Sequence, residues 1–351
     1  MVHTLDISTP LTPFEYAELQ RELGANPQKA AWSTNDYSAS GLTQITLYRI
    51  VRPNYTGHFI RIAMNPYHVM NQSADPMALF DPADFAALIP AFDFLITTIT
   101  NIILPSLPNW IACRIDYAVD AVVGNSATRP AADRYIELAR RGYLPFGATN
   151  QSQVDWISFR AGNSSCGVQL YHRGPALRSR FMGLAETIYQ QADTLLRLEV
   201  QCKKGRLASL AHKHHFPGRA LLYFMQTPDI DRYELSRQCH RIFGGYNFVS
   251  YRRAAATINR DSQLRRRTKE DMQYFIKAIE IEGGIMPAQE KWQNSMSSAL
   301  HFAKRRINVR FSPAQSRRLV RRLSSFGFHF VTIPASWHTG LIEHPFPCLI
   351  V

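Results

Sequence analysis

The sequence predicts an α+β fold in which an antiparallel sheet carries helices on one face, followed by a basic, mainly helical C-terminal region. Three observations lead to this prediction. The first periodic segments follow the order strand, strand, helix, strand, helix. The stretch Ile111–Asp120 alternates between an apolar face and an ionic face. The net charge is +13, and the segment from Arg252 to Arg322 alone holds 17 Lys/Arg against 6 Asp/Glu, a net of +11. Such a basic region favours a polyanionic partner.

The first 39 residues are expected to form a short helix and a loop, because Thr12 is a favourable N-cap with Glu15 three residues later. Two strands follow at 44–51 and 58–64, joined by a turn that contains Gly57, and they predict a hairpin. Residues 40–250 are then expected to form a domain around the sheet, and residues 251–351 a basic helical region.

Two helices are predicted on either side of the strand 111–120. One begins near Asp84, and Pro90 is expected to interrupt it before the apolar run 94–104, which we interpret as a core helix. The other spans 131–141 and ends at Gly142, because glycine favours the left-handed cap.

Three predicted strands share one pattern, an apolar face opposite a face that combines arginine with a carboxylate or a tyrosine. The polar face holds Arg114, Asp116 and Asp120 in the first strand, Gln169, Tyr171 and Arg173 in the strand 168–173, and Arg197, Glu199 and Gln201 in the strand 195–202. If these strands pair in one antiparallel sheet with helices on the apolar side, Asp116, Tyr171 and Glu199 converge on a single open face.

This set of residue types suits phosphodiester transfer. Asp116 and Glu199 can hold a hard divalent cation such as Mg²⁺ or Mn²⁺, which would polarise a phosphate. The phenol of Tyr171 attacks at neutral pH only where a metal or cationic neighbours stabilise the phenolate. Arg173 and Arg197 are the candidates for part of that positive field.

Three segments also resemble the core motifs of the replication initiation factors of rolling-circle plasmids and related mobile elements. They are CRIDYAVD at 113–120, GVQLYHR at 167–173 and LRLEVQCKK at 196–204, in matching order and spacing. FIRIAMNP at 59–66 is similar to a segment that precedes the first motif in that family, so the resemblance covers roughly residues 40–215.

The resemblance implies a nicking endonuclease domain over residues 40–250. Tyr171 would be the nucleophile that forms a covalent 5′-phosphotyrosine at a replication origin, Asp116 and Glu199 the metal ligands, and Asp120 a third ligand. The sequence departs from the family where members commonly read Tyr-Asn-Lys-Lys-x-Glu, because residues 171–176 read Tyr-His-Arg-Gly-Pro-Ala.

Origin DNA, in a single-stranded or hairpin region of a plasmid, phage or integrative element, is the partner that the resemblance implies, together with a host helicase and polymerase. The oligomeric state stays open, with a homodimer among the alternatives. A relaxase for conjugative transfer would use the same chemistry. A non-catalytic DNA-binding regulator, or a surface ion-pair ladder in place of a site, would explain the same residues without cleavage.

The basic C-terminal region is expected to bind DNA phosphates. A helix within 262–282 ends at Gly283, another runs from Pro287 to about residue 306, and a third begins at Pro313. A strand at 327–333 completes a layout that resembles a winged helix-turn-helix by analogy. The candidate DNA-binding residues are Arg114, Arg265, Arg266, Arg267, Arg305, Arg306, Arg317, Arg318, Arg321 and Arg322.

The cellular compartment is expected to be the cytoplasm. The five cysteines include no CxxC pair, which favours a reducing environment over a disulfide scaffold or a thiolate zinc site. The N-terminus lacks the layout of a signal peptide. The longest apolar run is shorter than the about 20 residues that a bilayer requires, so we expect no membrane partner.

Overall fold

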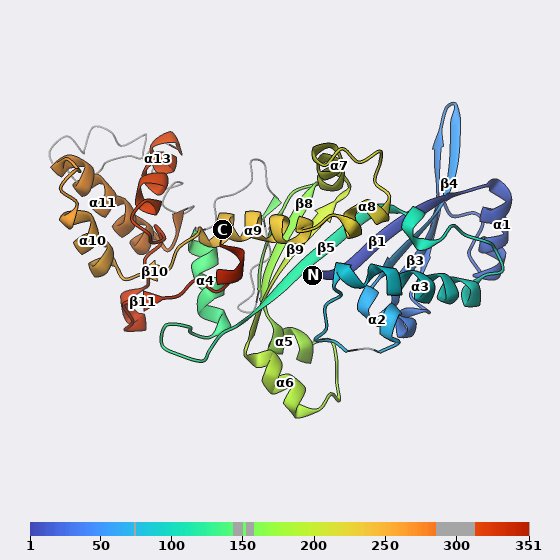
Figure 1. The fold of residues 1–351 in the computed structure, drawn as a ribbon, viewed down its shortest axis with the longest axis horizontal. Helices are drawn as coiled ribbons and strands as arrows, with labels where there is room; N and C mark the ends of the chain where they lie inside the picture. The colour runs from blue at the N-terminus through green and yellow to red at the C-terminus, as the bar shows by residue number, and fades with distance from the viewer. Residues whose placement is uncertain (74, 143–149, 152–157, 286–312, 351) are drawn as a thin grey trace. The chain divides into compact units, whose positions relative to one another are not determined.

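The computed structural model describes residues 1–73, 75–142, 150–151, 158–285 and 313–350. The fold is α+β with a large sheet, as the sequence predicts (Figure 1). Its strands are β1 (Val2–Leu11), β2 (Ala31–Thr34), β3 (Leu42–Arg52), β4 (Tyr55–Met64), β5 (Ile111–Val122), β6 (Asn150–Gln151), β7 (Ser158–Gly162), β8 (Cys166–His172), β9 (Leu195–Lys203), β10 (Phe248–Val249) and β11 (Leu341–Ile342).

The helices differ in length, and several are short. They are α1 (Pro13–Glu22), α2 (Pro66–Asn71), α3 (Phe85–Ile99), α4 (Ala132–Gly142), α5 (Arg173–Arg178), α6 (Glu186–Asp193), α7 (Lys204–Lys213), α8 (Leu221–Gln226), α9 (Ile230–Phe243), α10 (Tyr251–Arg260), α11 (Arg266–Glu282) and α13 (Pro313–Ser324). Within the described residues, the main sheet has the strand order β2-β3-β4-β1-β5-β9-β8-β7-β6, and β10 pairs with β11.

The chain divides into two compact units, and each is described by itself. Unit 1 comprises residues 1–119, 162–168 and 199–235. Unit 2 comprises residues 120–161, 169–198 and 236–351.

Strand β1 is the centre of unit 1, and the sequence analysis missed it. We expected residues 1–39 to hold only a helix and a loop, but β1 pairs antiparallel with both β4 and β5. A register shift between Val2 and Thr4, typical of a β-bulge, interrupts the alternation only at the start of the strand. Beyond the bulge, Leu5 and Ile7 are fully buried and belong to the core of the unit.

Several local predictions in unit 1 are confirmed. Helix α1 begins with a complete capping box, in which the backbone N–H of Glu15 donates to the Thr12 hydroxyl and the backbone N–H of Thr12 donates to the Glu15 carboxylate. Strands β3 and β4 form the predicted hairpin, but its turn is tighter than expected: the pairing continues to Arg52 and Tyr55, so Gly57 lies within β4 and not in the turn.

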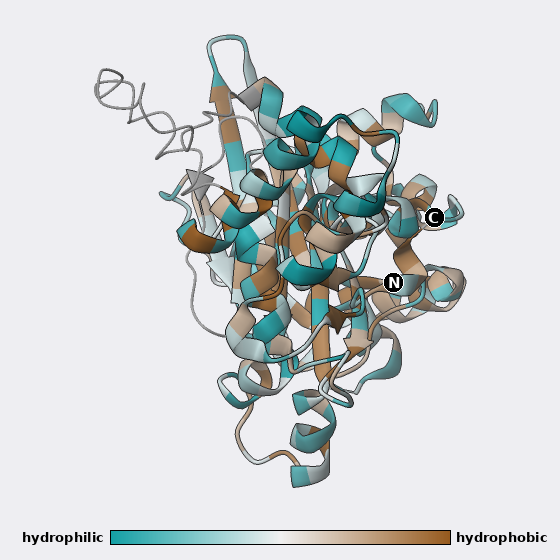
Figure 2. Cartoon of the chain, turned by 90° about the vertical axis from the view of Figure 1, so that its left-hand side faces the viewer, coloured by the Kyte–Doolittle hydropathy of each residue, from teal (hydrophilic) through white to brown (hydrophobic). Residues whose placement is uncertain are grey.

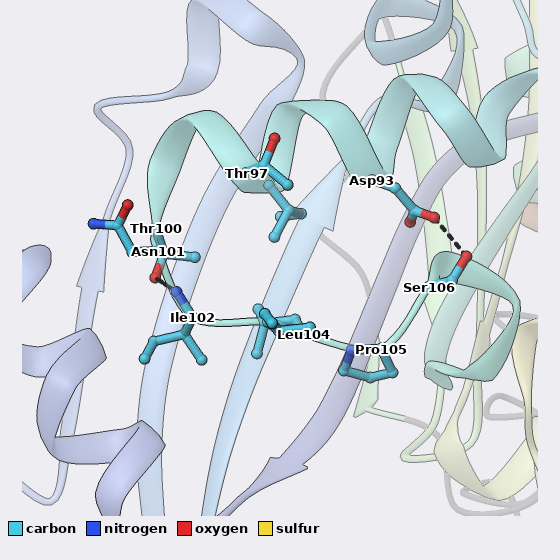
Figure 3. Close-up of a pocket in the computed structure, with 10 residues that line it drawn as sticks. Asp93, Thr97, Thr100, Asn101, Ile102, Leu104, Pro105 and Ser106 are labelled. Atoms are coloured by element: carbon cyan, nitrogen blue, oxygen red, sulfur yellow. Dashed lines mark hydrogen bonds between the residues drawn. The ribbon is translucent and has the colours of Figure 1, made fainter.

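The predicted interruption at Pro90 is wrong, because α3 continues through this residue. Four apolar side chains at helical spacing, Phe85, Leu88, Phe92 and Ile96, are buried along one face of α3, and this packing outweighs the hydrogen bond lost at proline. Figure 3 shows α3 lying across the neighbouring strands. The stretch Pro82–Ile99 is long and apolar enough to cross a membrane, and the core helices of soluble proteins meet the same criterion of length and composition.

The apolar run 94–104 is helical only as far as Ile99. Thr100 has an extended backbone, and its hydroxyl donates to the Glu22 carboxylate of α1. The side-chain amide of Asn101 donates to the same carboxylate at 3.0 Å. Helix α3 therefore ends where α1 supplies an acceptor, which the hydropathy of the run does not reveal.

In unit 2, two of the predicted C-terminal helices are present as α11 and α13, whereas one predicted strand is not. Helix α11 ends at Gly283 in the left-handed conformation (φ 77°), as expected. The same cap predicted at Gly142 is wrong, because Gly142 is the last residue of α4 and has no positive φ. The segment Gly327–Ile333 is not a strand, since it forms only isolated bridges through Phe328 and Ile333. The helix predicted from Pro287 lies outside the described residues. The described residues of the C-terminal region thus support helices but no β-wing.

Candidate functional site

The first group of predicted site residues lies in unit 1. We call it the acidic cluster, and it comprises Asp6, Arg61, Arg114, Asp116 and Glu199. The register of β1 and β5 places Asp6 opposite Arg114 and Thr4 opposite Asp116, so these side chains share one face of the sheet. Arg61 of β4 forms a bidentate pair with Asp6, and Arg114 forms one with Asp116.

Asp116 is fully buried, contrary to the solvent-facing patch that the sequence suggested. Burial raises the pKa of Asp116 to about 6, and the negative charges of Glu199 and Asp6 act in the same direction. The hydrogen bonds and charge of Arg114 oppose this rise. The pKa of Asp116 is therefore raised mainly by burial, and the neighbouring carboxylates add to this rise.

Glu199 is the second carboxylate of this cluster, and its side chain is 5% exposed. Its Oε2 atom lies 3.7 Å from Nδ1 of His3, and its Oε1 atom accepts a hydrogen bond from Gln201 at 3.4 Å. The sequence analysis missed His3, Asp6 and Arg61 because it missed β1. The alternation of Leu5, Ile7, Thr9 and Leu11 was the available signal.

The acidic cluster can be tested for its fit to a divalent cation. Within the described part of the chain, no group of three or more His, Cys, Asp or Glu side chains could hold a metal by itself. Two carboxylates are nevertheless enough for Mg²⁺, which keeps several waters and is completed by substrate phosphates. Both oxygens of Asp116 accept hydrogen bonds from Arg114 in this structure, so Asp116 and Glu199 would hold a cation of this open kind only where the cation takes the place of the Arg114 guanidinium.

The second group lies in unit 2. We call it the tyrosine cluster, and it comprises Asp120, Tyr171, Arg173 and Arg197. Tyr171 is on β8 and is 4% exposed. Arg173 is the first residue of α5, not the last of a strand, and its side chain is hydrogen-bonded to Tyr171. Burial lowers the pKa of Arg173, and the positive charge of Arg197 lowers it further.

Asp120 and Arg197 are joined by a bidentate ion pair. Nε and Nη2 of Arg197 donate to the two carboxylate oxygens of Asp120, each at 2.6 Å. Arg197 is fully buried, so the carboxylate neutralises a charge that burial would otherwise make costly. The third predicted metal ligand is thus engaged with an arginine in unit 2.

The structure therefore brings the predicted residues together in two sets. Asp116 and Glu199 influence each other in unit 1, while Tyr171, Arg173, Arg197 and Asp120 form one cluster in unit 2.

The predicted DNA-binding arginines fall into three groups. Arg114 is committed to Asp116. Arg305 and Arg306 lie outside the described residues. The others are exposed, on α13 and around the start of α11: Arg265, Arg266, Arg267, Arg317, Arg318, Arg321 and Arg322. On α13 the opposite face buries Leu319 and Leu323, as the periodicity predicts.

A pocket of about 380 Å³ lies in unit 1 beside the end of α3, and none of its lining residues belongs to the acidic cluster or the tyrosine cluster (Figure 3). Its acidic group, Asp93, accepts hydrogen bonds from the Ser106 hydroxyl at 2.5 Å and from the backbone N–H of Leu107 at 2.9 Å. These bonds hold the 101–106 loop against the helix, so we assign the pocket a structural origin.

Comparison with known proteins gives no family for this chain: no protein-family model, curated protein or solved structure matches it.

Proposed function

We propose that this protein nicks one strand of DNA at a replication origin, as the initiators of rolling-circle replication do. The observation that carries the proposal is the hydrogen bond between the side chains of Tyr171 and Arg173, with a second guanidinium, that of Arg197, nearby in the same cluster. Fixed positive charge beside a phenol supports both the phenolate and the negative charge that develops on a transferring phosphoryl group.

In the proposed reaction the Tyr171 oxygen attacks the phosphorus of a phosphodiester. The bond from phosphorus to the 3′ oxygen breaks as the bond from phosphorus to the tyrosine oxygen forms. The phenol proton is lost to solvent, and the departing 3′ oxygen takes up a proton, leaving a free 3′ hydroxyl for a polymerase. The Arg173 guanidinium would contact the phosphate and neutralise its charge. Arg197, which is buried and paired with Asp120, would position the cluster and would not contact the phosphate itself.

Asp116 and Glu199 are the residues that would hold Mg²⁺ or Mn²⁺, which would supply Lewis-acid polarisation of a phosphate oxygen. Arg114 orients the Asp116 carboxylate through its bidentate pair. Origin DNA is the proposed partner, with a host helicase and polymerase acting on the product. The proposed compartment is the cytoplasm, in keeping with five free cysteines.

A second candidate function is a DNA-binding regulator that does not cleave. Two observations favour it: Tyr171 is 4% exposed, and the carboxylates of Asp116 and Asp120 are both paired with arginine. Nicking requires Tyr171 to become accessible to a phosphate, whereas binding through the exposed arginines of α11 and α13 does not. A relaxase would share the nicking chemistry and differ in the DNA site.

The experiment incubates the full-length protein with supercoiled plasmids that carry the DNA flanking its gene, with Mn²⁺ or Mg²⁺. We expect open-circular product and a protein–DNA adduct that survives SDS, both abolished by EDTA. Tyr171→Phe should remove the adduct and lower nicking by at least about 100-fold, because the nucleophile is lost.

Tyr135→Phe is the matched control, because Tyr135 is also a buried tyrosine of unit 2, whose hydroxyl donates to the backbone carbonyl of Glu343. This variant should keep both nicking and adduct formation. Retarded mobility in a gel without any adduct in the wild type would support the regulator instead, and equal nicking by Tyr171→Phe would exclude Tyr171 as nucleophile.

A further inference from the structure

The β3–β4 hairpin extends beyond the strands that flank it in unit 1. Strand β4 pairs with β1 only over 58–64, and β3 pairs with β2 only over 45–48. The hairpin itself pairs on to Arg52 and Tyr55. We call residues 48–59 the β-arm. Its outer part, residues 49–57, extends beyond the flanking strands, while residue 48 pairs with β2 and residues 58–59 pair with β1. The β-arm rises at the top of Figure 1 and combines hydrophobic and hydrophilic residues in Figure 2.

One face of the β-arm carries a row of aromatic side chains. The register places Tyr48 opposite Phe59, Ile50 opposite Gly57 and Arg52 opposite Tyr55, so these residues share a face. The rings of Tyr48 and Phe59 are stacked, with centroids 5.1 Å apart and an interplanar angle of 15°. Tyr55 is 52% exposed at the outer end.

Gly57 makes this row continuous. A Cβ atom at this position would lie 2.2 Å from the Tyr55 hydroxyl oxygen and 2.8 Å from Cε2 of Phe59. The ends of the Tyr55 and Phe59 side chains therefore both lie over the glycine, and a side chain at this position would displace them. Tyr55, Phe59 and Tyr48 together form what we call the aromatic row.

Within the hairpin and the residues next to it in sequence, the charged side chains are all basic, although Arg61 at the inner end is paired with Asp6 of β1. Residues 37–74 contain no Asp or Glu, but they contain Arg49, Arg52 and Arg61. Arg52 is exposed beside Tyr55 at the tip. The outer part of the hairpin thus carries aromatic rings and arginine but no acidic residue. Such a surface is complementary to a ligand that has both flat rings and negative charge.

We propose that the β-arm binds single-stranded DNA, with bases stacking on the aromatic row and Arg52 contacting a phosphate. Single strands fit better than a duplex, because an aromatic ring can stack only on a base that has left its neighbours in the helix. The inference rests on the proposed function for the choice of DNA, and it places a contact for the melted origin on β3 and β4 instead of the C-terminal helices.

The test measures binding of the full-length protein to a fluorescein-labelled oligothymidylate by fluorescence anisotropy, at several salt concentrations and without divalent cations. Tyr55→Ala should raise Kd about five-fold or more, and Tyr55→Phe should restore binding, because stacking needs only the ring. Arg52→Ala should weaken binding and reduce the slope of log Kd against log salt by about 0.7, the contribution of one phosphate contact on a single strand.

Val51→Ala and Thr56→Ala are the matched controls. These two residues are paired with each other on the opposite face of the same hairpin, and Val51 is 68% exposed. They should leave Kd unchanged. Gly57→Ala should act like Tyr55→Ala, because the new methyl group displaces the Tyr55 ring. Circular dichroism checks that each variant keeps its fold.

Equal Kd values for Tyr55→Ala and Val51→Ala would overturn the proposal. So would a duplex of matched length that binds more tightly than the oligothymidylate and loses as much affinity in Tyr55→Ala. The binding measurement tests this proposal independently of the nicking reaction. Tyr171→Phe should bind the oligothymidylate normally, so a protein that never nicks can still show binding that depends on Tyr55, and a protein that nicks can lack it.

Discussion

At the scale of single residues, the sequence indicated which side chains share a face but not which of them pair. The alternation of β5 and β9 correctly placed acids beside arginines, and the negative charge of Glu199 contributes to the raised pKa of Asp116. Asp120 was expected to bind metal, but it holds the buried guanidinium of Arg197. The choice between a cation and an arginine depends on the neighbouring strand, which periodicity cannot specify.

The Asp120–Arg197 pair gives a stability prediction. Asp120→Asn removes a carboxylate from a buried guanidinium, so we expect the free energy of unfolding to fall by about 3 kcal/mol. Denaturant unfolding should show the same loss with EDTA and with Mn²⁺. The double variant Asp120→Asn/Arg197→Met, which removes both charges, should recover part of the stability. A loss seen only with the cation present would instead make Asp120 a ligand.

At the scale of elements, local signals succeeded where the chain makes its own contacts. The capping box of α1, the β3–β4 hairpin and the glycine at the end of α11 are each determined by adjacent residues, and each was predicted. The prediction of a strand at Gly327–Ile333 was wrong because residues 328–333 are buried on all sides, so their alternation does not separate a core face from a solvent face. There the backbone N–H of Val331 donates to Nδ1 of His329, a side chain taking the place of a partner strand.

Helix α9 supplies the prediction at this scale. Glu234 is fully buried, and Arg206 of α7 holds its carboxylate in a bidentate pair. The thiol of Cys202 on β9 lies 3.7 Å from the same carboxylate. Arg206→Met leaves this charge without its cation, so we expect a loss of about 3–5 kcal/mol in the free energy of unfolding.

The matched variant for this pair is Arg206→Met/Glu234→Met, which removes both charges and should recover most of the stability in the same urea titration. If the double variant is as unstable as Arg206→Met alone, the helix contact is held by packing and not by the ion pair.

At the scale of the whole molecule, the two units should respond to acid in opposite directions. In unit 2, burial lowers the pKa of His329 to about 3 and that of His344 to about 4. Below the unfolded value of 6.5 the unfolded chain takes up protons that the folded unit excludes, so this unit loses stability as the pH falls from 6.5 towards 4. In unit 1, the raised pKa of Asp116 stabilises the folded form below pH 3.8, and this contribution is lost as the pH rises through about 6.

Hydrogen exchange followed by mass spectrometry tests this difference. Between pH 7 and pH 5, after correction for the intrinsic exchange rate, protection should fall for peptides of α10 and β10 and hold or rise for those of β1. His344→Asn keeps an acceptor for the backbone N–H of Phe346 but does not titrate, so it should weaken the pH dependence in unit 2. Uniform loss of protection in both units would contradict the assignment.

The central place of β1 also bears on synthesis. During synthesis this strand precedes both of its partners, and one of them, β5, begins at Ile111, roughly a hundred residues later. Until then a nascent chain has a long strand with one open edge, which invites pairing with a neighbouring polypeptide. Translation that pauses before β5 should therefore favour chaperone engagement or aggregation, and pausing after it should not.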